Sequence, residues 1–222
     1  MMNSQSLNIL PGVYDGLGAA IARHVGARGI YASGGAIARS FGLPDLGLVS
    51  ISEMAARLEV IVRAFDGPVI ADGDTGYGDV QHVRRMVQMF EASGIRGVHI
   101  EDQDFPKRCG HLEGKSLISI DAMARKIEAA VNARQSSDFL IIGRTDAIAI
   151  EGFDQAIIRA QAMVDAGADV IFIEAPETQE QVQLIPSLFN VPALINMFPG
   201  GKTPYIKPVQ LEAYGYRYMI VP

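Results

Sequence analysis

The 222-residue sequence has a single cysteine, so it can form no disulfide within the chain. A reducing, cytoplasmic compartment is where such a protein is expected. Basic residues are also few, because 19 lysines and arginines stand against 25 aspartates and glutamates, for a net charge of −6. A nucleic-acid-binding surface needs clustered positive charge. We therefore expect no nucleic-acid partner.

Long apolar runs are absent from the sequence. No stretch approaches the roughly 18 residues of a membrane-spanning helix. The first residues, MMNSQSLNILPG, lack the basic start and apolar stretch of a secretory signal. What the chain does have is 49% hydrophobic residues and only 20% charged ones. This composition supplies a sizeable core and argues against disorder, so we expect a folded protein without a membrane partner.

Short apolar runs alternate with amphipathic helical patterns from one end of the chain to the other. The runs are nearly continuous and rich in β-branched residues, as expected of strands that are buried on both faces. They occupy residues 8–11, 29–32, 68–71, 97–100, 139–143, 169–173, 192–195 and 216–221.

Local signals mark several of the helices between these runs. Ser50 and Glu53 match a capping box ahead of a helix whose apolar residues share one face. The next helix shows the same apolar spacing, and Gly94 is placed to end it. A later helical pattern ends before Gly167. About seven helices therefore separate about eight strands.

The segments VGARGIYASG, SGIRGVHIED and AGADVIFIEA echo one another, since each reads as a helix end, a glycine turn and a strand. With no linker-like stretch, the alternation predicts one α/β domain over residues 1–222, a (β/α)8 TIM-type barrel. A doubly wound open sheet is the alternative that alternation alone leaves open. No GxGxxG loop follows the first strand, so a dinucleotide-binding version of that sheet has no support.

Polar residues stand at the ends of most predicted strands, which is where β/α barrels carry their reactive groups. They are Ser33-Gly34-Gly35, Asp72-Gly73-Asp74, Glu101-Asp102, Arg144-Thr145-Asp146, Glu174 and Asn196. Converging buried carboxylates repel one another and need a cation. The donors are oxygens without a Cys/His cluster, which predicts Mg²⁺, with Mn²⁺ as the second choice. Asp72 and Asp74 are two apart, so an extended strand would turn both to one side. The simpler alternative for any one acid is a helix cap or a local arginine partner.

The segment FPKRCGHLEGK, residues 105–115, is polar and contains two glycines. It follows the fourth predicted strand, so we expect a loop over the barrel mouth that is less ordered than the strands. Cys109 lies there beside Lys107, Arg108 and His111. Positive neighbours lower the pKa of a thiol, which favours an acid or a nucleophile; the alternative is an inert, buried thiol. The remaining histidines lie in no motif and are expected to be structural: His24, His82 and His99.

Seven motifs in order along the chain resemble those of the isocitrate lyase and phosphoenolpyruvate mutase superfamily. They are YASGG at 31–35, GLPDLG at 42–47, ADGDTGYG at 71–78, HIEDQ at 99–103, KRCGH at 107–111, GRTDA at 143–147 and NMFPGGKTP at 196–204. The resemblance covers nearly the whole chain. KRCGH is similar to the lyase branch of the family, whereas DGD at 72–74 departs from the DAD that is more usual in lyases.

The resemblance implies a Mg²⁺-dependent enzyme that cleaves a carbon–carbon bond in a small 2-hydroxy di- or tricarboxylate. The substrate would be methylisocitrate-like or dimethylmalate-like, and a 2-oxo acid would leave through an enolate-type intermediate. The implied metal site consists of Asp72 as principal ligand with Asp74 and Glu101, and Asp45 shares its water shell. The implied substrate-binding residues are Ser33, Gly34, Gly35, Asp45, Arg144, Asn196 and Thr203. The implied catalytic residues are Arg144, Glu174 and Cys109, the last as the general acid that protonates the enolate.

Two other readings of the function stay open. The same enolate-stabilising site could decarboxylate or hydrolyse oxaloacetate, or serve a phosphonopyruvate or mutase-type reaction. A catalytically weak barrel that only binds dicarboxylates is the more distant alternative.

The last predicted strand has no helix after it. In the family, the eighth helix is exchanged between subunits, so the resemblance implies a homo-oligomer, a tetramer built from two swapped dimers. We therefore expect the natural protein to continue past Pro222 by at least one amphipathic helix. Without that helix, the last strand would expose an apolar flank made of Tyr216, Tyr218, Ile220 and Val221.

Overall fold

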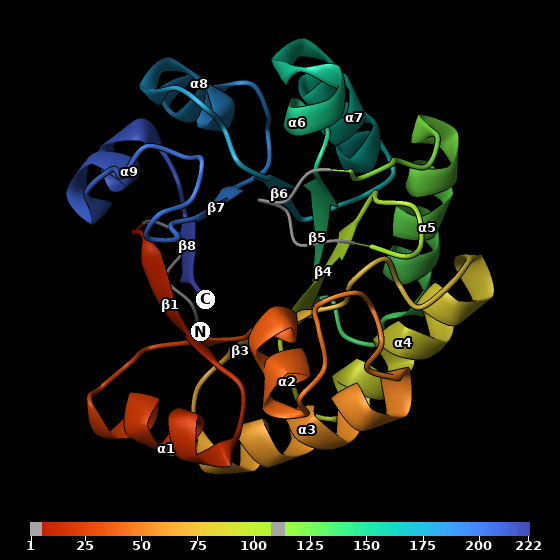
Figure 1. Cartoon of the computed structure of the whole chain (residues 1–222), viewed down its shortest axis with the longest axis vertical. Helices are drawn as coiled ribbons and strands as arrows, with labels where there is room; N and C mark the ends of the chain where they lie inside the picture. The colour runs from red at the N-terminus through yellow and green to blue at the C-terminus, as the bar shows by residue number, and fades with distance from the viewer. Residues whose placement is uncertain (1–5, 108–113) are drawn as a thin grey trace.

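A computed structural model describes residues 6–107 and 114–222 of the chain. Within those residues, eight parallel strands close into one barrel, in which each strand pairs with the next in sequence (Figure 1). They are β1 (Asn8–Val13), β2 (Ile30–Ala32), β3 (Val69–Asp72), β4 (Gly97–Glu101), β5 (Leu140–Thr145), β6 (Val170–Ile173), β7 (Ala193–Asn196) and β8 (Tyr218–Val221). β8 pairs with β1, from Asn8 opposite Tyr218 to Pro11 opposite Val221. The predicted (β/α)8 barrel is confirmed, and the open sheet is wrong.

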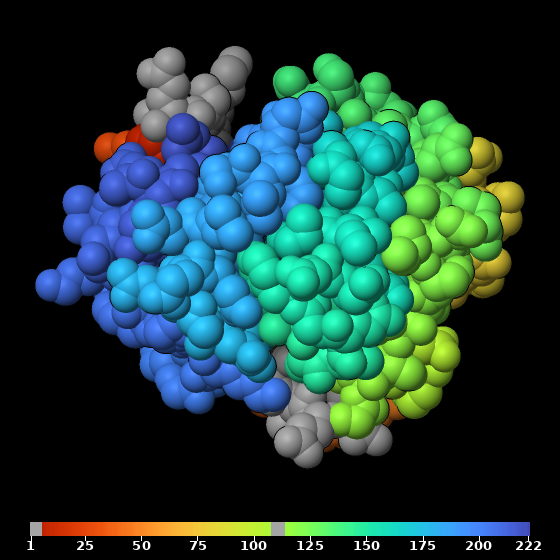
Figure 2. Space-filling view, turned by 90° about the horizontal axis from the view of Figure 1, so that it is seen from above, coloured from red at the N-terminus to blue at the C-terminus, as the bar shows by residue number. Residues whose placement is uncertain are grey.

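Helices surround this sheet on its outer side, as Figure 1 shows. They are α1 (Gly16–His24), α2 (Gly34–Ser40), α3 (Ile51–Ala64), α4 (Val80–Ala92), α5 (Ile120–Ala133), α6 (Ile148–Glu151), α7 (Phe153–Asp165), α8 (Gln179–Leu184), a 3₁₀ turn at Ile185–Ser187, and α9 (Pro208–Tyr214). In Figure 2 the cover runs without a break from α5 in green through α7 in teal to α8 in blue. In the described part of the chain, none of the helices combines the length and apolar character that crossing a membrane requires.

The capping signals in the sequence act as predicted. The Glu53 amide donates to Ser50 Oγ at 3.3 Å, and the Ser50 amide donates to Glu53 Oε2 at 2.8 Å, so the capping box at α3 is complete. Gly94 follows the last turn of α4 with φ +90°. That left-handed backbone favours glycine and ends the helix.

The prediction of about seven helices missed two short ones, α2 and α6. Ser33 was expected to end a strand, but it is the N-cap of α2, where its Oγ accepts from the Ala36 amide at 3.3 Å. Gly34 and Gly35 are therefore the first residues of a helix. The chain turns from β2 into α2 right at the barrel mouth, which places this helix start beside the strand ends.

The core has two layers, as alternation along barrel strands requires. The inner layer fills the barrel with buried side chains, so the barrel is a packed core and not a pore. It consists of Leu10, Tyr31, Ile70, Ile142, Val170, Phe172, Leu194 and Ile220. The outer layer packs the other strand faces against the helices and includes Met54, Leu58, Val83 and Phe90.

The prediction of an exposed flank at the last strand is wrong for Ile220 of β8 and for Tyr216, which precedes β8. Ile220 is buried because it points into the barrel, and Tyr216 is buried with its hydroxyl donating to the Val182 carbonyl at 2.9 Å. Tyr218 and Val221 are half-buried. Removing an outer helix cannot expose Ile220, which faces inward, whereas Tyr216 belongs to the outer core layer and contacts α8. Large exposed apolar side chains lie instead on β1, which pairs with β8, and on α1 with its C-cap: Ile9, Leu17, Ile21 and Val25.

Candidate active site

A cavity of about 570 Å³ opens at the C-terminal ends of the strands. It brings together most of the residues that the sequence analysis assigned to substrate, metal or catalysis. Those that line it are Ser33, Gly35, Asp45, Asp72, Glu101, Arg144, Glu174 and Asn196. They come from the ends of β2 to β7 and the segments that follow β2, so the rule that barrels place their chemistry at this end holds here.

The remaining predicted residues lie elsewhere. Gly34 lies behind the cavity wall, where an added Cβ would come 2.5 Å from Asp72 Oδ2. Asp74 lines a second cavity, of about 600 Å³, and Lys107 lines both. Thr203 lies between β7 and α9 and lines neither cavity. Cys109, like Arg108 and His111, lies outside the described residues.

Asp74 reaches this region by a turn and not by strand alternation, which corrects the prediction. β3 ends at Asp72, and Asp74 adopts a left-handed backbone with φ +45° while its amide donates to Asp72 Oδ1 at 2.9 Å. Between them, Gly73 passes so close to β4 that an added Cβ would lie 2.6 Å from the His99 carbonyl oxygen. The backbone here has no room for the alanine of a DAD segment without a local shift.

Lys107 is buried between acids from two segments of the chain. Its Nζ lies 2.6 Å from Asp74 Oδ1 and also pairs with Asp45. Burial alone would lower the pKa of Lys107, but the charges of Asp74 and Asp72 outweigh it and raise that pKa above its usual value. The ammonium group therefore supplies positive charge inside the acidic cluster.

His99 is fully buried and lies beneath the cluster formed by Lys107, Asp45, Asp72 and Asp74. Its Nε2 is 2.9 Å from the Tyr31 hydroxyl and 3.5 Å from Asp72 Oδ1. Burial lowers the pKa of His99 to about 4, so the ring is neutral near pH 7. This histidine was expected to be structural, and it lies against Asp72 at the floor of the site.

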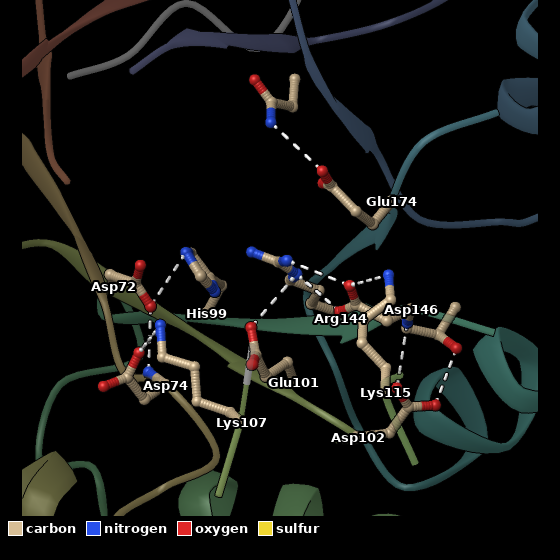
Figure 3. A network of polar contacts seen from close by, with 12 residues as sticks. Asp72, Asp74, His99, Glu101, Asp102, Lys107, Lys115, Arg144, Asp146 and Glu174 are labelled. Atoms are coloured by element: carbon tan, nitrogen blue, oxygen red, sulfur yellow. Dashed lines mark hydrogen bonds and ion pairs between the residues drawn. The ribbon is translucent and has the colours of Figure 1, made fainter. Parts of the chain in front are cut away.

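Arg144 lies at the centre of the site (Figure 3). Its Nε donates to Asp146 Oδ2 at 3.0 Å and its Nη2 to Asp146 Oδ1 at 3.2 Å, while Glu101 Oε2 is 3.4 Å from Nε. The guanidinium also stacks 5.0 Å from the centre of the Phe172 ring. Because Asp146 occupies the Nε–Nη2 edge, a ligand carboxylate must approach the Nη1–Nη2 end of Arg144.

Glu174 and Asn196 form another part of the wall. They end β6 and β7, and Asn196 Nδ2 donates to Glu174 Oε1 at 3.3 Å. In Figure 3 the Glu174 carboxylate stands apart from the group around Lys107, with Arg144 between the two. A small polar molecule in the cavity would therefore meet an acidic cluster, a cation and an amide–carboxylate pair.

The carboxylate oxygens in this region suit a hard cation, although two of the carboxylates, Asp45 and Asp74, form ion pairs with Lys107. Among the described residues, no three Asp, Glu, His or Cys side chains are spaced to hold a metal ion. Yet Asp45, Asp72 and Glu101 line one cavity, and Glu101 Oε1 is buried with no hydrogen-bond partner in the described structure. Burial raises the pKa of Glu101 well above its usual value, so a cation would be needed to hold it ionised. Oxygen donors of this kind fit Mg²⁺ or Mn²⁺.

Sequence reasoning missed several residues that shape this site. Lys107 was considered only as a neighbour of the cysteine, and Lys115 only as a loop residue. Asp102 and Asp146 stood at strand ends, but nothing local distinguished them from metal ligands. The structure shows that they are a support layer: Asp102 Oδ2 accepts from Thr145 Oγ1 at 2.7 Å, and Asp102 Oδ1 accepts from the Asp146 amide at 3.0 Å.

Comparison with known proteins gives a consistent assignment. The family model described as phosphoenolpyruvate phosphomutase matches residues 1–222. A 2-methylisocitrate lyase of Aeropyrum pernix is 44% identical over 222 residues, which are 100% of this chain and 71% of that protein. A 2,3-dimethylmalate lyase of Eubacterium barkeri is 41% identical over 223 residues, 100% of this chain and 77% of that protein.

Solved structures extend the comparison. An oxaloacetate acetylhydrolase in complex with the inhibitor 3,3-difluorooxalacetate superposes with a TM-score of 0.94 at 38% identity, over 98% of this chain and 75% of that one. A phosphonopyruvate hydrolase complex with oxalate and Mg²⁺ gives a TM-score of 0.87 at 30% identity, over 99% and 76%. The chain therefore belongs to the phosphoenolpyruvate mutase and isocitrate lyase superfamily, as an enzyme of its carbon–carbon lyase branch.

Proposed function

We propose that this chain is a Mg²⁺-dependent lyase that cleaves a small 2-hydroxy di- or tricarboxylate of the methylisocitrate or dimethylmalate type and releases a 2-oxo acid. One observation carries the proposal: Asp72 and Glu101 line the same cavity as the buried cation Arg144. That combination suits a substrate with an anionic carboxylate beside a metal-binding oxygen. The lyases at 41–44% identity support it.

Mg²⁺ would be held by Asp72 as principal ligand, with Glu101, Asp74 and Asp45 completing or orienting its shell. When bound, it would supply a Lewis acid that favours loss of the proton from the substrate hydroxyl, whose oxygen becomes the carbonyl oxygen of the released 2-oxo acid as the carbon–carbon bond breaks. Burial would raise the pKa of Asp72, but His99 and Lys107 hold that pKa below its usual value. Asp72 is therefore ionised at neutral pH and ready to bind a cation.

The other residues of the cavity would bind and orient the substrate. The Nη1–Nη2 end of Arg144 would hold one carboxylate. The start of α2 would bind the 2-oxo acid end through the Ser33 hydroxyl and the Gly34 and Gly35 amides, since the Ser33 amide donates to the Val13 carbonyl at 3.0 Å. Glu174 and Asn196 would contact the other half of the substrate. Thr203 stays a proposed contact that needs the segment after β7 to approach the cavity.

Cys109 would donate the proton to the carbanion that remains when the carbon–carbon bond breaks. The electron pair of that bond stays on the α-carbon of the second product, and the thiol proton neutralises it. Cys109→Ser should lower turnover by roughly 10²–10⁴-fold, the usual contribution of a general acid, with Mn²⁺ binding largely intact. A fully active serine variant would remove Cys109 from the mechanism.

We also propose that the protein acts as a homo-oligomer, with the exchange of a helix between subunits that the family resemblance implied. The exposed apolar side chains on β1 and α1 support association of subunits. A cytoplasmic location is part of the same proposal, and its support is the single cysteine. The partners would be small carboxylates and other copies of this chain.

The test is release of a 2-oxo acid from a panel of substrates. Cleavage of either 2-methylisocitrate or 2,3-dimethylmalate between the hydroxyl-bearing carbon and its neighbour yields pyruvate. We expect Mg²⁺-dependent pyruvate release from one of them, its loss with EDTA, and its loss in Asp72→Asn. Undiminished activity in EDTA would contradict the metal, and no turnover of any 2-hydroxy acid would contradict the lyase.

Oxaloacetate hydrolysis is the second candidate, because a structure of oxaloacetate acetylhydrolase superposes with a TM-score of 0.94. The same panel separates the two. Hydrolysis of oxaloacetate yields oxalate and acetate, whereas the lyase reaction yields pyruvate and a second carboxylate. Oxalate formation with no cleavage of the 2-hydroxy acids would favour the hydrolase over the lyase.

A further inference from the structure

Behind Arg144 lies a buried ion-pair chain that the proposed chemistry does not use. Asp146 binds the Nε–Nη2 edge of Arg144, and Lys115 Nζ lies 3.1 Å from Oδ1 of the same carboxylate (Figure 3). The side chains of Asp146 and Lys115 are 0% and 2% exposed. Neither Asp146 nor Lys115 is among the described residues that line the cavity.

The charges of this chain explain why a second cation is needed. Arg144 has Asp146 on one edge and Glu101 Oε2 at 3.4 Å. A single arginine between two ionised carboxylates leaves a net charge of −1, which would repel a third carboxylate from a ligand. Lys115 shares Asp146 with Arg144, so this second cation offsets the negative charge, and the two cations and two carboxylates together sum to zero. Burial would raise the pKa of Asp146, but Arg144 and Lys115 hold it below its usual value, which keeps the carboxylate ionised.

The same contacts fix the direction in which Arg144 points. The Asp146 amide donates to Asp102 Oδ1 at 3.0 Å, so the acid that holds Arg144 is itself held by the end of β4. Lys115 belongs to the segment between β4 and α5, whose two sides are joined by the Asp104 amide donating to the Ser116 carbonyl at 2.8 Å. With its Nε–Nη2 edge occupied, Arg144 presents its Nη1–Nη2 end to the cavity.

We infer that Asp146 and Lys115 are a positioning pair that sets the orientation and effective charge of Arg144, and through it the affinity of the site for a ligand carboxylate. The inference rests on the proposed function only in taking Arg144 as the carboxylate-binding group. A purely structural ion pair would instead contribute to stability and leave carboxylate affinity unchanged. The two readings differ in what removal of Lys115 does to ligand binding.

The experiment measures oxalate binding by isothermal titration calorimetry at saturating Mg²⁺. Mn²⁺ affinity from electron paramagnetic resonance and thermal unfolding are recorded for the same samples. Lys115→Met should raise the oxalate Kd by about tenfold, because a unit charge one side chain away acts across a poorly screened interior. Its Mn²⁺ affinity should stay within about twofold of the wild type, since Lys115 pairs with Asp146, which is not one of the proposed metal ligands. Lys115→Arg should restore oxalate binding, and Lys207→Met, which removes an exposed lysine near α9, should change nothing.

Asp146→Asn separates orientation from charge. This variant makes the site more positive by one charge, so a purely electrostatic role predicts tighter oxalate binding. Our inference predicts binding weaker by about tenfold or more, because Arg144 loses the bidentate partner that orients it.

Three outcomes would overturn the inference. In the first, Lys115→Met and Asp146→Asn lower the unfolding temperature but bind oxalate as the wild type does. In the second, Asp146→Asn binds oxalate more tightly. In the third, the wild-type chain with Mg²⁺ fails to bind oxalate. Because these measurements need no turnover, weaker oxalate binding in an enzyme that cleaves none of the 2-hydroxy acids would support the inference while contradicting the proposed lyase reaction.

Discussion

At the residue scale, burial decides the charge of the groups around the cavity more than their intrinsic chemistry does. Burial keeps His99 neutral near pH 7 and raises the pKa of Glu101 well above its usual value. Lys107 and Arg144 remain charged because acids surround them. A site that pairs buried acids with buried cations keeps a strong local field while limiting its net charge.

Gly34 offers a direct test of how closely this site is packed. A methyl group there would lie 2.5 Å from Asp72 Oδ2, so Gly34→Ala must displace the Asp72 carboxylate or the start of α2. We expect turnover to fall by roughly 100-fold, as a misplacement of about 1 Å can cause, together with weaker Mn²⁺ binding. The matched control is Gly18→Ala in α1, where the nearest atom is 3.4 Å away and activity should not change. A fully active Gly34→Ala variant would show that Asp72 needs no fixed position.

Asp102 provides a prediction about pH. Burial raises the pKa of Asp102 to about 6 from an ordinary value of 3.8. Between those pH values the folded chain binds this proton more tightly than the unfolded chain. Its contribution to stability is therefore complete below about pH 4 and is lost as the pH rises through about 6.

The matched variant is Asp102→Asn, which does not titrate. The free energy of unfolding of the wild type, relative to this variant, should fall by about 3 kcal/mol between about pH 4 and pH 7.5. Urea denaturation at several pH values measures that difference. A difference that does not change with pH would mean that Asp102 keeps its ordinary pKa in the fold.

At the element scale, the turn after β3 has the most unusual backbone of the described chain and is held by a distant helix. Asp74, Gly76 and Tyr77 have φ values of +45°, +87° and +61°. Lys126 of α5 donates to the Thr75 carbonyl at 2.8 Å from a largely buried position. Left-handed backbone conformations are unfavourable for non-glycine residues. The hydrogen bond from Lys126 therefore helps to keep the turn in place.

Lys126→Met should remove that bond and leave the Thr75 carbonyl without its donor. We expect the free energy of unfolding to fall by about 1–3 kcal/mol, the cost of a buried polar group that loses its partner. Chemical denaturation measures it, with Arg125→Met, an exposed neighbour on α5, as the control that should change little. Equal stability of the two variants would mean that water replaces the ammonium group at Thr75.

At the scale of the whole molecule, the closed barrel buries both layers of its core but leaves a row of apolar side chains exposed on α1. Leu17, Ile21 and Val25 follow one another at a spacing of four along α1 and its C-cap, and are 70%, 55% and 73% exposed. Residues four apart share one helix face. Exposed apolar faces of this kind commonly mark contacts between proteins.

We predict that this face lies in a contact between copies of the chain. The wild type should sediment as an oligomer in analytical ultracentrifugation, and Leu17→Glu combined with Ile21→Glu should shift it toward smaller species. Ile158→Glu, at a half-exposed position on α7, is the control and should leave the distribution unchanged. A wild type that is monomeric at micromolar concentration would contradict this prediction.

Most elements of this fold can be predicted from the amino-acid sequence, because their signals are local. Each predicted strand lies within a residue or two of an observed one, and the capping box at Ser50 and Glu53 formed as predicted. A buried parallel strand needs a continuous apolar run, and a helix start needs a partner for its free amides. Seven residues that the strand-end rule pointed to line one cavity, and Asp45, which only the family resemblance implied, lines it with them.

Tertiary structure alone decided which of those residues touch one another. Lys107 lies between Asp45 and Asp74, although 62 residues separate it from Asp45. Lys115 and Arg144 meet on Asp146, and His99 lies against Asp72. Sequence spacing carries no information about such pairs, since they form only when eight strands close around one axis and the connecting segments fold over the strand ends. The same closure turned Ile220 inward, where the sequence had suggested an exposed flank.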